Sequence, residues 1–141
     1  MEQKIVYILL GIMLFYCGTK DFISRQISIF FVAGISGLIL IIYPFGFYLT
    51  FINMAGGLLI GIVLIIVSKL TRGQIGLGDG LIFCATGLGL GFWANLCLLL
   101  YSLTMAAAFS GFMILVRKKV RTYTIPFIPF VCLGYWGVVL L

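Results

Sequence analysis

The sequence contains no histidine and only three acidic residues, Glu2, Asp21 and Asp79, among its 141 residues. The absence of histidine excludes a Ser-His-Asp triad, a Cys-His pair and a zinc site with histidine ligands. None of the four cysteines is part of a Cys-x-x-Cys pair, and each lies in an apolar run, so we expect them to be small buried hydrophobic residues. Charged residues make up 9% of the chain, against about 25% in a soluble domain.

Hydrophobic residues account for 64% of the chain and form long runs. This pattern predicts an all-α, polytopic integral membrane protein with a single transmembrane domain over residues 1–141. The run Leu81–Val116 is about 36 residues long, too long for one crossing, and the glycines Gly87, Gly89 and Gly91 indicate a turn inside it. We therefore expect about six spans: Ile5–Cys17, retained rather than cleaved as a signal peptide, Ile27–Tyr43, Phe51–Val67, a short fourth from Leu81, a fifth from about Leu96 to Val116, and Ile125–Leu141.

The net charge of +6 comes from short basic clusters between the apolar runs, so we interpret it as a topology signal and not as a nucleic-acid surface. With six spans, eight of the nine basic residues fall on one face, and only Lys4 falls on the other. The positive-inside rule makes the basic face cytoplasmic, with both termini outside. The expected location is the cell (cytoplasmic or inner) membrane.

Two of the three acids, Asp21 and Asp79, are expected on this cytoplasmic face, each at a membrane boundary. Asp79 lies in the stretch Gly73–Gly80, which we expect to be a helix-poor loop, since each glycine weakens a helix by about 1 kcal/mol. Gly76 and Gly78 would let the backbone of a substrate approach Asp79. Two neighbouring carboxylates tend to share a proton, which supplies one general base and one general acid, as in aspartic proteases. Such a site needs no metal and no organic cofactor.

Structural roles for the same two acids stay open at this point. Asp21 could cap a helix start or pair with Arg25, and Asp79 could cap the fourth span.

The segment Gly76-Leu77-Gly78-Asp79 resembles the Gly-x-Gly-Asp motif of membrane aspartic proteases. The order of features resembles the type IV prepilin peptidases and their preflagellin relatives in particular: an Asp followed by a basic residue and Ile matches Asp21, Arg25 and Ile27. A late Pro-Phe-x-Pro-Phe matches Pro126–Phe130. The resemblance covers the chain from about Cys17 to Gly134. Ser28 stands where the family usually has proline, and Leu81 where many members have lysine, which leaves the effect on substrate preference open.

The resemblance implies an aspartic endopeptidase with Asp21 and Asp79 as the catalytic dyad and Gly76 and Gly78 as substrate-binding glycines. Its partner would be a prepilin-like substrate with a basic leader and an apolar helix, cut at the cytoplasmic face of the lipid bilayer. Members that also methylate the product use a cytoplasmic Cys-x-x-Cys region, which this chain lacks, so the resemblance implies peptidase activity alone and no S-adenosylmethionine. Neither the particular prepilin nor the oligomeric state follows from the sequence.

Two other classes of function are open: a small transporter or channel in which Asp79 relays protons or binds a cation at a broken helix, and a non-catalytic assembly subunit. Flux in proteoliposomes without cleavage would indicate the transporter, and a silent Asp79→Asn substitution would indicate the subunit.

Overall fold

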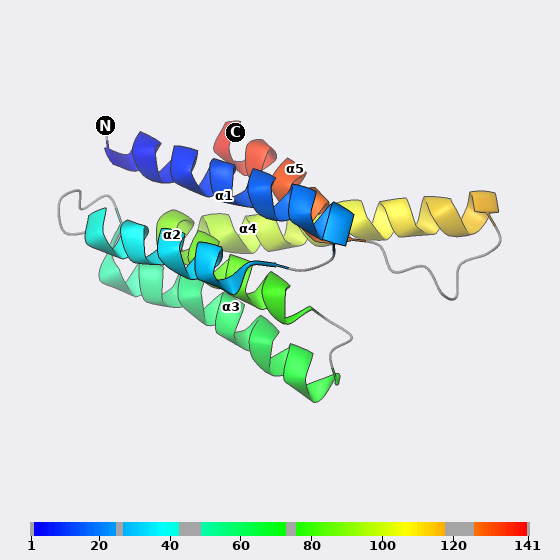
Figure 1. The fold of residues 1–141 in the computed structure, drawn as a ribbon, viewed down its shortest axis with the longest axis horizontal. Helices are drawn as coiled ribbons and strands as arrows, with labels where there is room; N and C mark the ends of the chain where they lie inside the picture. The colour runs from blue at the N-terminus through cyan, green and yellow to red at the C-terminus, as the bar shows by residue number, and fades with distance from the viewer. Residues whose placement is uncertain (1, 25–26, 43–48, 73–75, 118–125, 141) are drawn as a thin grey trace.

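The computed structural model of this chain describes residues 2–24, 27–42, 49–72, 76–117 and 126–140. Within these ranges the chain forms five helices and no strand, which confirms the all-helical prediction (Figure 1). The helices are α1 (Glu2–Ser24), α2 (Ile29–Ile42), α3 (Phe51–Leu70), α4 (Leu77–Arg117) and α5 (Ile128–Leu140).

Three of these helices, α1, α3 and α4, are long and apolar enough to cross a membrane, while α2 and α5 are shorter apolar helices. The expected membrane character is therefore supported by length and composition. Six separate spans were expected, but the described residues form five helical elements, because the expected fourth and fifth spans belong to one element, α4.

That element, α4, is interrupted at Gly91, which has φ 79° and ψ −178°. Asn95 donates a hydrogen bond to the carbonyl of Phe83, twelve residues earlier, at 3.0 Å. A straight helix would separate these residues by about 18 Å along its axis, so the chain folds back at Gly91 (Figure 1). A turn was expected inside this run, but the segment after it begins at Phe92 and not near Leu96.

The first segment of α4 packs against α3 through glycines on both helices. Gly57 lies against Gly87, and Gly61 against Cys84, so closely that a Cβ built on either α3 glycine would collide with the backbone of α4. Two helix backbones can approach this closely only where side chains are missing. The α3–α4 pair is consequently the closest-packed part of the bundle.

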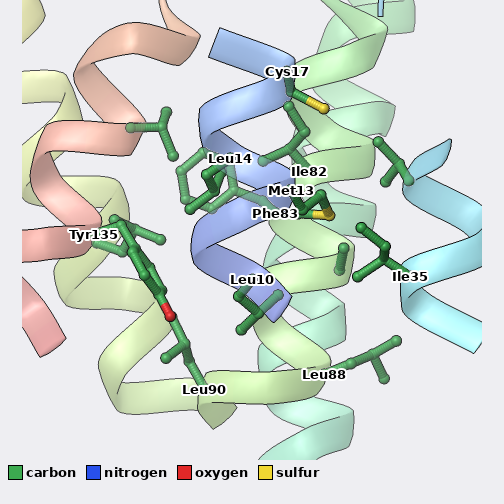
Figure 2. Close-up of a cluster of buried hydrophobic side chains, with 14 of the residues drawn as sticks. Leu10, Met13, Leu14, Cys17, Ile35, Ile82, Phe83, Leu88, Leu90 and Tyr135 are labelled. Carbon is green, nitrogen blue, oxygen red and sulfur yellow. The ribbon is translucent and has the colours of Figure 1, made fainter. Parts of the chain in front are cut away.

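The core lies where α1 crosses α4, with α2 and α5 on either side (Figure 2). Leu10 and Leu14 of α1 meet Ile82 and Phe83 of α4, and all four side chains are fully buried. Tyr135 of α5 is also buried, and its hydroxyl donates to the carbonyl of Tyr7 on α1 at 2.6 Å. This hydrogen bond joins helix α5 to helix α1.

Candidate functional site

Asp21 lies on α1, three residues before the last residue of that helix, Ser24. The first span was expected to end at Cys17 and to be followed by a polar loop, but α1 continues to Ser24, so this expectation is wrong. No glycine or proline interrupts residues 19–24, and the hydroxyls of Thr19 and Ser24 donate to the carbonyls of Tyr16 and Lys20, at 2.9 and 3.0 Å. Helix α1 therefore continues for about two turns beyond Cys17 and holds Asp21 on a regular element.

Asp79 lies in the first turn of α4, so the expectation of a helix-poor loop is wrong for residues 77–80, while Gly73–Ile75 lie outside the described residues. The N–H of Asp79 donates to the carbonyl of Gly76 at 3.1 Å, and its carboxylate accepts a hydrogen bond from the backbone of Gly76. An acidic residue at this position satisfies free N–H groups at a helix start. The capping role left open for Asp79 is therefore present in the structure, and it does not exclude a catalytic role.

The two aspartates come from distant parts of the sequence to the same end of the bundle. The negative charge of Asp21 acts on Asp79 electrostatically, and both side chains are half-buried. Cys17, one turn before Asp21 on α1, is buried and belongs to the same apolar core as Ile82 of α4 (Figure 2). Crossing of α1 and α4 thus positions a pair of carboxylates at the edge of an apolar interior.

The start of α5 forms the third side of this site. The backbone N–H of Ile128 donates to Oδ2 of Asp21 at 3.4 Å. Sequence reasoning singled out the surrounding Pro126–Phe130 segment only by resemblance and missed this contact. A backbone donor carries no residue signature, so no pattern in the sequence could have identified it.

The two glycines proposed to admit a substrate have neighbours of their own. A Cβ at Gly76 would lie 3.1 Å from Oδ2 of Asp79, and a Cβ at Gly78 would collide with the side chain of Ile27. The small size of Gly78 therefore lets Ile27 pack on the start of α4. Substrate binding by either glycine stays a prediction.

A second polar cluster lies inside the bundle, away from the aspartates. Thr86 donates to Oδ1 of Asn95 at 2.8 Å, and Nδ2 of Asn95 donates to the carbonyls of Gly57 and Phe83, at 3.1 and 3.0 Å. These side chains are fully buried, and each polar atom named here has a partner. The cluster joins α3 to both segments of α4 and was not anticipated from the sequence.

No group of three potential metal ligands of the His, Cys, Asp or Glu type occurs in the parts of the chain that the structure describes. Of the basic residues, Lys20 lies next to Asp21 on α1, and Lys69 lies in the last turn of α3. Arg25 and Lys118–Arg121 lie outside the described residues, so the pairing of Asp21 with Arg25 is not tested.

No protein-family model matches the chain, and neither a curated protein nor a solved structure is detectably similar to it.

Proposed function

We propose that the chain is a membrane aspartic endopeptidase that removes the basic leader from prepilin-like substrates at the cytoplasmic face. One observation carries the proposal: in a chain with two aspartates and no histidine, the fold brings Asp21 and Asp79 near enough for the charge of one to act on the other. Their location at the end of an apolar bundle suits a peptide bond next to a membrane helix. The resemblance around Asp79 and Pro126–Phe130 adds the substrate class.

In the proposed reaction the ionised carboxylate of the pair takes a proton from a water molecule, and the water oxygen bonds to the scissile carbonyl carbon. The protonated carboxyl gives its proton to the amide nitrogen as the C–N bond breaks. One peptide bond and one water are consumed, and a carboxyl and an amino terminus are formed. No metal or organic cofactor takes part in this scheme.

The proposal includes two finer statements about the membrane. First, α4 crosses twice, turning at Gly91, so that the chain has six crossings. Second, the end of the bundle with the aspartates faces the cytoplasm, since Lys20 and Lys69 lie at the corresponding ends of α1 and α3.

The test is conversion of a co-expressed prepilin-like protein, with a basic leader and an apolar helix, read as a gel shift. We expect Asp21→Asn and Asp79→Asn each to abolish detectable cleavage, because general acid–base steps contribute about 10² to 10⁴-fold each and one pair supplies both. The double variant should be little worse than either single one, because residues that act as a unit are not additive.

Glu2→Gln is the matched control, because Glu2 begins α1, at the opposite end of that helix from Asp21. This variant should cleave normally, and size-exclusion chromatography in detergent should show all variants folded. Near-normal cleavage by folded Asp79→Asn would exclude the aspartic-protease mechanism.

One observation favours the transporter as a second candidate: α4 is a broken helix, and broken helices form binding sites in transporters. However, the break is at Gly91 and not at Asp79, and the polar side chain next to it, Asn95, is already hydrogen-bonded. Ion flux in proteoliposomes, without cleavage, would support this candidate instead.

A further inference from the structure

Asp21 is located where a negative charge is disfavoured by its own helix. It lies in the last turn of α1, and the C-terminal end of a helix carries a partial negative charge. It also faces the charge of Asp79. Some other group must therefore stabilise a carboxylate at this position if it is to be ionised in the reaction.

The start of α5 supplies such a group. The first N–H groups of a helix have no acceptor within the helix, and here Phe130 and Val131 both donate to the carbonyl of Phe127, while Pro129 has no N–H. The N–H of Ile128 is directed to Asp21 instead. It lies at the positive end of a 13-residue helix.

Packing keeps this donor in place. Gly18 of α1 lies against Ile128 and Pro129, with 3.9 Å between a Cβ built there and either residue. The side chain of Ile128 is fully buried, and the Tyr135–Tyr7 hydrogen bond joins the same two helices further along. Helix α5 therefore cannot move away from Asp21 without disturbing the core.

We infer that Ile128 is a positioning residue: its backbone N–H holds the carboxylate of Asp21 opposite Asp79 and stabilises the charged form. Each aspartate then has a backbone partner at a helix start, Ile128 for Asp21 and Gly76 for Asp79. Asp79 on α4 and Cys17 on α1 are among the titratable groups coupled to Asp21 by charge. The inference rests on the proposed function, in which Asp21 is one of the reacting carboxylates.

The first test does not depend on cleavage. The chain has only two aspartates, so labelling with [4-¹³C]aspartate gives two side-chain carboxyl signals in NMR spectra, and Asp79→Asn assigns them. In the unsubstituted protein, the amide signal of Ile128 should shift with pH at the midpoint at which the Asp21 carboxyl titrates. In Asp21→Asn this shift should disappear. If the chemical shift of the Ile128 amide does not change as Asp21 titrates, the inference is wrong.

The second test uses Ile128→Pro, which removes the N–H at a position where proline is tolerated in a helix. Ile128→Ala is the matched control, because it removes the same buried side chain and keeps the N–H. In Ile128→Pro, we expect the low-pH side (the acid limb) of the plot of kcat/KM against pH to move to higher pH by about one unit. The reason is that the ionised carboxylate of Asp21 loses a hydrogen bond, so that it is protonated at a higher pH. Ile128→Ala should keep the acid limb of the unsubstituted enzyme, even if less protein folds.

The outcomes separate the two proposals. Absence of cleavage by the folded, unsubstituted protein contradicts the proposed function, whatever the NMR titration shows. Cleavage with identical acid limbs in Ile128→Pro and Ile128→Ala contradicts the positioning role and leaves the function intact. If Ile128→Pro does not fold, the amide titration of the unsubstituted protein still decides.

Discussion

At the scale of single residues, the absence of a side chain decides how closely α3 and α4 can approach. Gly57 and Gly87 place their backbones in direct contact, and Asn95 donates to the carbonyl of Gly57 from the other segment of α4. The glycines of α2 do not make a close backbone contact of this kind, because neither Gly34 nor Gly37 has a described neighbour within 4 Å of a built Cβ. Identical residues therefore differ in importance because of what lies opposite them.

We predict that Gly57→Ala destabilises the protein while Gly37→Ala does not. A methyl group at Gly57 would lie 2.9 Å from the carbonyl carbon of Gly87, and backbone atoms cannot rotate away as a side chain can. Overpacking costs typically about 1–3 kcal/mol, whereas alanine in place of a helical glycine with open space is favourable by about 0.5–1 kcal/mol. Thermal denaturation in detergent measures both. Equal unfolding temperatures for the two variants would contradict the close α3–α4 contact.

At the scale of elements, α4 folds back on itself, and this brings its first turn to the end of the bundle that holds Asp21. Its first segment, Leu77–Leu90, is about 21 Å long and carries Asp79 at its start. Its second segment continues to Arg117 and extends beyond the rest of the bundle (Figure 1). The break at Gly91 lets one apolar run contact α3, α1 and α5 while Asp79 stays next to Asp21.

We predict that Gly91→Ala strains this break, because φ 79° with ψ −178° is a conformation that essentially only glycine adopts. The expected loss is about 1–3 kcal/mol of stability, and the Cβ would also lie 2.9 Å from the side chain of Leu49. Gly111→Ala is the control on the same helix, since its Cβ would meet no described atom within 4 Å. The measurement is again the unfolding temperature in detergent. A Gly91→Ala protein as stable as Gly111→Ala would show that α4 does not need this backbone conformation.

At the scale of the whole molecule, three helices run toward the same side. The C-terminal ends of α1, α3 and α4 are on the same side of the molecule in Figure 1. The first two of these ends carry Lys20 and Lys69, and Arg117 ends the third. One end of the bundle thus collects both aspartates and much of the positive charge, which is the arrangement the proposed cytoplasmic site requires.

We predict the side of the membrane from this asymmetry. In a background without the four native cysteines, a membrane-impermeant maleimide added from outside should fail to label Arg72→Cys and Lys118→Cys. Lys4→Cys should be labelled, because it lies near the start of α1 at the opposite end. Ready labelling of Arg72→Cys from outside would place the aspartates on the wrong side for the proposed substrate.

The sequence by itself determined the helical class and the apolar character, because both follow from local composition summed over long runs. It also identified Asp21 and Asp79 as the residues to examine, since few acids and no histidine leave little choice. Helix ends were predicted less well. Residues 19–24 stay helical, with the hydroxyls of Thr19 and Ser24 bonded to the helix backbone, and Asp79 is helical because it caps α4.

Only the tertiary structure decided which groups meet. The electrostatic coupling of Asp79 to Asp21, the hydrogen bond from Ile128 to Asp21 and the Asn95 cluster each join residues distant in sequence. Such contacts depend on how helices cross and on where small residues let backbones approach, and neither quantity is local. The resemblance pointed to the segment around Ile128, but a backbone N–H is common to nearly every residue, so only its position in space made it a candidate partner of Asp21.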